Sequence, residues 1–187
     1  KGMETVVIYD PSKTVNPTSD PTAIVGVSLD TKANKIYFRD VVNKRIHPDE
    51  AYREVCDMAD RLGTPNIGVE VTSLNEFITF PLMNYVKTRN RFYNVVELKA
   101  RGKKEDRIRA LSPFYKMKSV YHNEDINIRG ALESQLLSFP RSKHDDVMDA
   151  FAYVVEMYDL GERFFTGTAS DTDREAIERE YRELQDE

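Results

Sequence analysis

A cluster of acidic residues marks the start of a predicted helix late in the sequence. Asp146 and Asp149 are three residues apart and Asp145 and Asp149 are four apart, so either pair occupies neighbouring positions on a helix surface. Two carboxylates this close repel each other, and the positive end of the helix offsets only part of that repulsion. A divalent cation would offset far more, although Asp149 could instead pair with Arg141 or Lys143. The spacing therefore indicates a metal site to which other acids contribute.

Two further acids stand at the ends of predicted buried strands. β-Branched runs over residues 4–10 and 66–71 predict strands that carry Asp10 and Glu70 near their C-terminal ends. If these strands are parallel neighbours, both carboxylates emerge at the edge where open α/β sheets place their sites. Carboxylate oxygens suit Mg²⁺ or Mn²⁺. We therefore expect Asp10, Glu70 and the acids of residues 145–149 to bind such an ion. Two ions are more in keeping with the number of acids than one.

Each of these residues also has a purely structural interpretation. Asp10 is of a type that often caps a turn, and the acids at residues 145–146 could cap the helix that follows them. Glu70 is the hardest to explain in this way, because an unpaired carboxylate is costly to bury within an apolar strand. His144 could either shuttle a proton or cap the helix.

The remaining segments predict how the acids are positioned. Residues 22–29 and 35–42 follow the first strand through short connections, which predicts an antiparallel meander. Later strands separated by helices add parallel strands to the same sheet. We therefore expect an α/β fold with a mixed sheet of five or more strands and helices on both faces. The other predicted elements are strands over residues 66–71, 93–98 and 120–122, helices over residues 47–62, 74–87, 105–116 and 128–138, and the acidic helix.

Length and composition are those of an ordinary globular chain. The 187 residues, 40% hydrophobic and 32% charged, suffice for one domain with a buried core, and we expect a soluble protein. The single cysteine, Cys56, excludes an internal disulfide framework and fits a reducing cytosol. No apolar run approaches the roughly 20 residues of a membrane-spanning helix. We expect a domain over residues 1–160, cut from a longer polypeptide, and an acidic tail over residues 161–187 that is partly helical or disordered.

Positive charge is concentrated in one segment. The formal net charge is −5, and residues 170–187 account for all of it with eight acids and three bases. Residues 99–118 carry eight bases and two acids. Such a segment is typical of a surface that contacts DNA phosphates without reading bases, and a solvated helix face is the alternative. The residues that we expect to contact DNA are Lys99, Arg101, Lys103, Lys104 and Arg107.

Four motifs in this order resemble the nuclease domain of the large terminase subunits of tailed bacteriophages. They are VVIYDPS (6–12), IGVEVT (67–72), KEDRIRALSP (104–113) and HDDVMDA (144–150). The resemblance covers residues 4–160. It implies the RNase H-like fold, which that family shares with Holliday-junction resolvases and retroviral integrases.

The resemblance also implies an activity and its residues. The activity is metal-dependent cleavage of concatemeric double-stranded DNA during genome packaging, by two-metal-ion hydrolysis with the ions about 3.5–4 Å apart. The acids of the family fall on Asp10, on Glu70 and on one or more of Asp145, Asp146 and Asp149, of which Asp146 is our first choice. The catalytic candidates are therefore Asp10, Glu70, Asp146 and Asp149, and the expected cofactor is Mg²⁺ or Mn²⁺.

Partners follow from the same resemblance. Full-length terminases carry an ATPase motor domain, whereas this chain has no Gly-x-x-x-x-Gly-Lys-Ser/Thr phosphate loop. The motor domain, the portal and the small terminase subunit are thus expected partners, together with double-stranded DNA, and no membrane is involved. The implied location is the cytoplasm of the host cell.

Two other functions remain open. A junction-resolving nuclease of the same fold would be a stable dimer that prefers branched DNA. A non-catalytic RNase H-like module that docks DNA or a portal would bind without cleaving in Mg²⁺ or Mn²⁺. A terminase nuclease would instead cut duplexes with little sequence preference.

Overall fold

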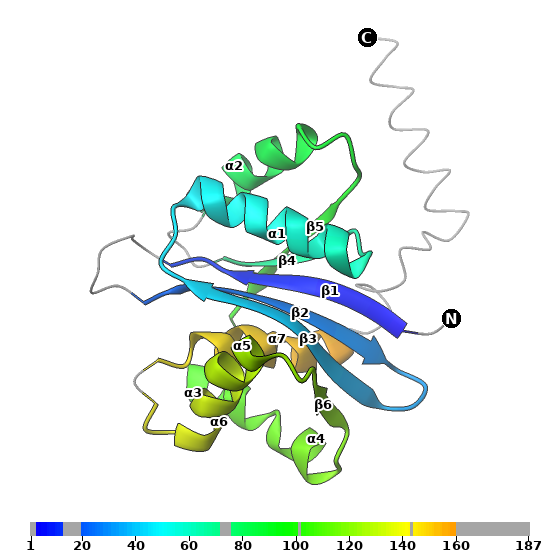
Figure 1. The fold of residues 1–187 in the computed structure, drawn as a ribbon, viewed down its shortest axis with the longest axis vertical. Helices are drawn as coiled ribbons and strands as arrows, with labels where there is room; N and C mark the ends of the chain where they lie inside the picture. The colour runs from blue at the N-terminus through cyan, green and yellow to red at the C-terminus, as the bar shows by residue number, and fades with distance from the viewer. Residues whose placement is uncertain (1–2, 13–19, 72–75, 101, 143, 160–187) are drawn as a thin grey trace.

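A six-stranded sheet forms the centre of the computed structural model, which describes residues 3–12, 20–71, 76–100, 102–142 and 144–159. The spatial order of the strands is β5-β4-β1-β2-β3-β6, and helices pack on both faces (Figure 1). The α/β architecture expected from the sequence is therefore confirmed. The strands are β1 (Met3–Asp10), β2 (Thr22–Asp30), β3 (Lys35–Lys44), β4 (Asn66–Val71), β5 (Asn94–Lys99) and β6 (Val120–His122).

Mixed pairing within the sheet brings the two acid-bearing strands together. β1 is antiparallel to β2, and β2 is antiparallel to β3, as the predicted meander requires. On its other side β1 is parallel to β4, with Tyr9 opposite Val69. Parallel neighbours end at the same edge of a sheet, so Asp10 and Glu70 lie side by side in the next register position.

The sheet is buried on both faces. Along β1, Ile8 packs in the cluster that contains α7 (Asp146–Asp159), whereas Tyr9 packs in the cluster that contains α1 (Pro48–Leu62), following the two-residue period of a strand. Figure 1 shows α1 and α2 (Glu76–Lys87) on one face of the sheet. The helices on the other face are α3 (Lys104–Arg109), α4 (Ser112–Lys116), α5 (Ile126–Ile128), the π-helical segment η1 (Arg129–Glu133), α6 (Ser134–Ser138) and α7.

Helix α7 is buried on every side along its first two turns. It contacts β1 and β2 of the sheet as well as α3 and α6. Apart from Asp146 and Asp149 this stretch is apolar all round, and such a helix is stable only in an interior position. The acids of its first turn are therefore held close to the end of β1. The buried apolar residues of this stretch are Val147, Met148, Ala150, Phe151, Ala152, Tyr153 and Val154.

The single helix predicted over residues 105–116 is wrong, because the structure divides it into α3 and α4. α4 begins with Pro113 in its first turn. The ring of Pro113 would clash with the carbonyl group of Arg109, four residues earlier, and Arg109 is the last residue of α3. The proline therefore ends one helix and begins the next.

Other predicted elements differ in detail. The helix predicted over residues 128–138 begins two residues earlier and contains the wide turn η1, which takes up an extra residue within the helix. Pro81 lies inside α2. The predicted tail over residues 161–187 lies outside the described residues. No helix among the described residues is long and apolar enough to cross a membrane.

Candidate metal centre

Three carboxylates from three elements converge at one edge of the sheet. Asp10 ends β1, Glu70 lies in the adjacent strand β4, and Asp149 lies in the first turn of α7. One carboxylate oxygen from each lies within 4.8 Å of the other two. Glu70 is 8% exposed and Asp149 is 4% exposed, whereas Asp10 keeps some contact with solvent. The structure thus brings together three of the five acids that the sequence analysis grouped.

The electrostatics of the three acids favour a cation. Burial raises the pKa of Asp10 well above its ordinary value, and the neighbouring carboxylates of Glu70 and Asp149 raise it further. Burial also raises the pKa of Asp149, although Arg107 and Lys104 oppose the shift. A carboxyl group whose ionised form is destabilised by burial and like charge gains most from a divalent ion.

Arg107 of α3 orients Asp149. Its Nε and Nη2 atoms donate to Oδ1 of Asp149 at 3.1 and 2.7 Å, and both side chains are almost fully buried. The guanidinium group also lies over the ring of Tyr153, 4.9 Å from its centroid. A forked arginine that binds one carboxylate oxygen leaves the other oxygen of Asp149 for a different partner.

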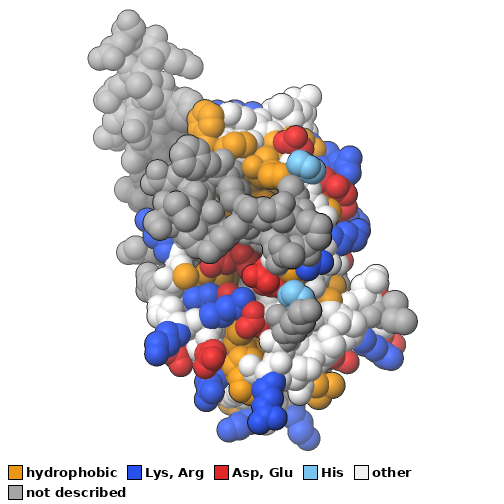
Figure 2. Space-filling view, turned by 90° about the vertical axis from the view of Figure 1, so that its left-hand side faces the viewer, with side chains coloured by type: hydrophobic (Ala, Val, Ile, Leu, Met, Phe, Trp, Pro, Cys, Tyr) orange, Lys and Arg blue, Asp and Glu red, His pale blue; other side chains and the backbone are white. Residues whose placement is uncertain are grey.

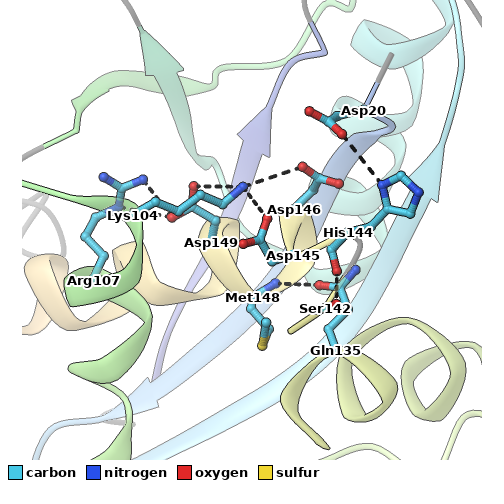
Figure 3. A network of polar contacts seen from close by, with 10 residues as sticks. All are labelled: Asp20, Lys104, Arg107, Gln135, Ser142, His144, Asp145, Asp146, Met148 and Asp149. Atoms are coloured by element: carbon cyan, nitrogen blue, oxygen red, sulfur yellow. Dashed lines mark hydrogen bonds and ion pairs between the residues drawn. The ribbon is translucent and has the colours of Figure 1, made fainter. Parts of the chain in front are cut away.

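Lys104 lies among the acids of α7. Its Nζ atom is 2.6 Å from Oδ1 of Asp145, 3.7 Å from Oδ1 of Asp146 and 3.6 Å from Oδ2 of Asp149 (Figure 3). Burial alone would lower the pKa of Lys104, but the hydrogen bond to Asp145 and the charges of the three acids raise it above its ordinary value. The ammonium group is therefore charged and supplies one positive charge beside the acids.

The acids of α7 do not all meet at one point. Asp146, our first choice from the sequence, is 6% exposed and lies with Asp20 and His144, whereas Asp149 joins Asp10 and Glu70. Asp145 precedes α7. Its carbonyl group accepts the amide hydrogen of Asp149 at 2.9 Å, and its carboxylate contacts Lys104. The metal and catalytic roles predicted for Asp145 and Asp146 stay predictions.

The basic residues expected to bind DNA fall into two groups. Lys104 and Arg107 face the acids, which the sequence did not predict. Lys99 and Lys103 are exposed, and Lys99 lies opposite Val71, close to the edge where Glu70 emerges. Figure 2 views the edge where β1 ends and shows acidic side chains at the centre with lysine and arginine side chains beside them. Arg101 lies outside the described residues.

The sequence analysis missed one residue that positions the start of α7. Gln135 of α6 is buried, and its Oε1 atom accepts the amide hydrogen of Met148 at 3.1 Å (Figure 3). This bond satisfies one of the free amide groups at the helix N-terminus. A polar residue amid the apolar residues Leu132 and Leu136 was the only signal for it in the sequence.

Solved structures were found with the same arrangement of elements. The nuclease domain of the large terminase of P22 aligns with a TM-score of 0.62 and 16% identity, covering 87% of this chain and 83% of that chain. The human cytomegalovirus terminase nuclease domain, soaked with manganese and bound to an inhibitor, aligns with a TM-score of 0.65 and 10% identity, covering 90% and 89%. The chain has the fold of a viral terminase nuclease domain.

A resolvase structure also aligns with this chain. The fowlpox virus Holliday junction resolvase aligns with a TM-score of 0.51 and 14% identity, covering 83% of this chain and 99% of that chain. The expected RNase H-like architecture is therefore confirmed. No protein-family model matches the chain, and no curated protein matches it. The fold is thus recognisable at sequence identities of 16% or less.

Proposed function

We propose that the chain is a metal-dependent endonuclease that cleaves double-stranded DNA, acting as the nuclease part of a terminase during phage genome packaging. The observation that carries the proposal is the convergence of Asp10, Glu70 and Asp149 at the edge of a terminase-like sheet. These carboxylates come from segments far apart in the sequence. Bringing like charges together costs free energy, and a bound divalent cation would offset that cost.

The donor set fits a hard divalent ion. All three residues offer carboxylate oxygens, which Mg²⁺ and Mn²⁺ prefer. Related folds were studied with divalent ions. The human cytomegalovirus domain was soaked with manganese, and a mutant of the domain from bacterial virus Sf6 was solved with manganese and with calcium. We assign Mg²⁺ or Mn²⁺ to this chain, with two ions in keeping with the number of acids.

Each of the residues around the three acids has a separate role in the proposed hydrolysis. A divalent ion held by Asp10, Glu70 and Asp149 would supply the positive charge that activates water and stabilises the departing oxygen of a phosphodiester. Asp10 and Glu70 have a fixed separation because they are anchored in paired parallel strands. Arg107 fixes the direction of the Asp149 carboxylate. Lys104 compensates part of the charge of Asp145 and of the two acids in the first turn of α7.

Exposed bases beside the acids support DNA binding. Lys99 ends β5 opposite Val71, and the exposed Lys103 precedes α3, with Arg101 between them in the sequence. Lysine contacts to phosphates position DNA without reading its sequence, and they weaken as salt rises. This behaviour suits a nuclease that cuts a passing duplex at varied sequences.

The packaging context supplies the partners and the location. A terminase nuclease works beside an ATPase motor domain, a portal and a small terminase subunit, and we propose the same partners for this chain. Its place of action would be the cytoplasm of the host cell. A junction-resolving activity is the second candidate, because nearly the whole fowlpox resolvase chain aligns with this fold.

Digestion of plasmid DNA tests the proposal. Mn²⁺, Mg²⁺, Ca²⁺ and a chelator are compared in parallel with linear, supercoiled and four-way-junction substrates. We expect cleavage of plain duplex in Mn²⁺ or Mg²⁺ and none in the chelator, and Asp10→Asn should abolish it. Cleavage confined to the junction would favour the resolvase. Binding without cleavage in every metal would favour the docking module and contradict a nuclease.

A further inference from the structure

A second group of potential ligands lies next to the start of α7. It consists of Asp20, just before β2, and of His144 and Asp146 at the beginning of α7. One ligand atom from each residue lies within 4.8 Å of the other two. None of these atoms belongs to the group formed by Asp10, Glu70 and Asp149.

Two atoms of this group are buried and lack hydrogen bonds. Nδ1 of His144 and Oδ2 of Asp146 make no hydrogen bond to any described residue, and both atoms are inaccessible to solvent. Nδ1 of His144 is 3.6 Å from Oδ1 of Asp20, which exceeds the length of a hydrogen bond. A buried carboxylate oxygen without a partner costs free energy that some ligand normally offsets. Asp146 as a whole is 94% buried, since only 6% of it is exposed.

The neighbours of Asp146 leave the unpartnered oxygen free. Lys104 approaches Oδ1 of Asp146 at 3.7 Å and does not contact Oδ2. Figure 3 shows Lys104 on one side of the Asp146 carboxylate and His144 with Asp20 on the other. The hydroxyl group of Ser142 donates to the carbonyl oxygen of His144, which fixes the backbone that carries the imidazole. Oδ2 of Asp146 therefore has no hydrogen-bond partner among the described residues, and the other two potential ligands lie beside it.

We propose that Asp20, His144 and Asp146 form a second cation site, which takes a divalent first-row transition ion such as Mn²⁺. Two carboxyl groups and one imidazole offer a mixed nitrogen and oxygen donor set. An imidazole ligand favours transition ions over Mg²⁺ or Ca²⁺. Three protein ligands leave further positions for water or a phosphate oxygen. The site does not depend on the proposed nuclease activity, because an ion can bind here in a chain that cleaves nothing.

The bound ion would join parts of the chain that are distant in sequence. Asp20 precedes β2, whereas His144 and Asp146 begin α7, so one ion would fix the β2 edge to the acidic helix. It would also add positive charge beside Asp146, whose Oδ1 atom lies 3.7 Å from Lys104. The second site would thus alter the charge balance around the three-acid group without sharing a ligand with it.

Pulsed electron paramagnetic resonance of bound Mn²⁺ tests the site directly, because it detects coupling to a ligating nitrogen. The chain has three histidines, of which His47 is exposed and forms no side-chain cap on α1. We expect imidazole ¹⁴N coupling in the wild-type protein and in Glu70→Gln, loss of that coupling in His144→Gln, and retention of it in the matched control His47→Gln. Bound Mn²⁺ without nitrogen coupling, or coupling that survives in His144→Gln, would overturn the proposal.

A second variant tests the site with a substitution that should leave the fold intact. The Asp20 side chain is 74% exposed, so Asp20→Asn should not disturb packing. It should raise the dissociation constant of Mn²⁺ at the nitrogen-coupled site by about tenfold or more. A titration of the coupling amplitude with Mn²⁺ measures this change. An unchanged titration would remove Asp20 from the site and contradict the proposed ligand set. Failure of the nuclease proposal would look different, because wild-type protein would then bind Mn²⁺ with nitrogen coupling and still leave DNA intact.

Discussion

The buried ion pair between Arg107 and Asp149 offers a quantitative test of how the metal centre is balanced. Only 7% of the Arg107 side chain and 5% of the Asp149 side chain are exposed, and the shortest contact between them is 2.7 Å. The variant Arg107→Met keeps the length and packing of the stem but removes the charge. It leaves the Asp149 carboxylate buried with Lys104 as its remaining cationic neighbour, 3.6 Å from Oδ2.

The size of the effect follows from burial. Removing one partner of a buried ion pair destabilises a protein by about 3–5 kcal/mol, because the other charge is left uncompensated. Lys104 still neutralises part of the Asp149 charge, so we expect a loss near the lower end, about 3 kcal/mol in the free energy of unfolding. Mn²⁺ should restore more stability to the variant than to the wild-type protein, because it supplies the missing positive charge. An ion at a hundred times its dissociation constant contributes about 2.7 kcal/mol.

Urea unfolding at pH 7, in a chelator and again in Mn²⁺, measures both effects. The matched control is Arg61→Met, because Arg61 also contacts a carboxylate, that of Asp40, at 2.7 Å but has a side chain that is 51% exposed. An exposed pair contributes at most about 1 kcal/mol, so the control should change little. If Arg107→Met cost no more than Arg61→Met in the chelator, Asp149 would not carry a buried charge that needs compensation, and the electrostatic reasoning would be refuted.

Three further variants probe the same edge of the sheet. Lys104→Gln removes a positive charge close to Asp149 and should tighten Mn²⁺ binding in calorimetry, whereas weaker binding would mean that Lys104 supports the ion. The raised pKa of Asp10 means that its carboxylate destabilises the metal-free fold at neutral pH, so Asp10→Asn should be more stable than the wild type in a chelator. This gain should shrink as the pH falls through the raised pKa of Asp10 toward about 4, where the carboxyl group of the unfolded chain also begins to take up its proton. A gain independent of pH would exclude the repulsion. Lys99→Ala with Lys103→Ala should weaken DNA binding and reduce the slope of log affinity against log salt by about 0.9 for each lost phosphate contact, and an unchanged slope would exclude both lysines from the contact surface.

The two acid-bearing strands were predictable because each follows from a local pattern, whereas the parallel pairing of β1 with β4 entered only as a condition. Asp10 and Glu70 each stand near the end of a β-branched run. The acid spacing of α7 likewise follows from helix geometry alone. These features depend on residues close together in the sequence, so one sequence was sufficient.

The surroundings of the acids depend on contacts that no local pattern shows. Lys104 and Arg107 belong to a basic run that is typical of an exposed surface. The chain turns after β5 so that α3 packs against α7, and both side chains meet the acids there. The grouping of Asp146 with Asp20 is also tertiary, because Asp20 lies in a polar loop with no pattern of its own. The break between α3 and α4 is different, because Pro113 itself indicates in the sequence that a helix ends before it.

Cleavage of plasmid DNA by Glu70→Gln, compared with Glu97→Gln, is the measurement that bears most directly on the metal centre. The two glutamates lie in the paired strands β4 and β5, but Glu70 is buried beside Asp10 whereas Glu97 is exposed. We predict that Glu70→Gln remains folded and loses both Mn²⁺-dependent cleavage and Mn²⁺ affinity at the three-acid group, while Glu97→Gln cleaves like the wild type. Cleavage at the wild-type rate by folded Glu70→Gln would show that the three converging acids are not the catalytic metal site.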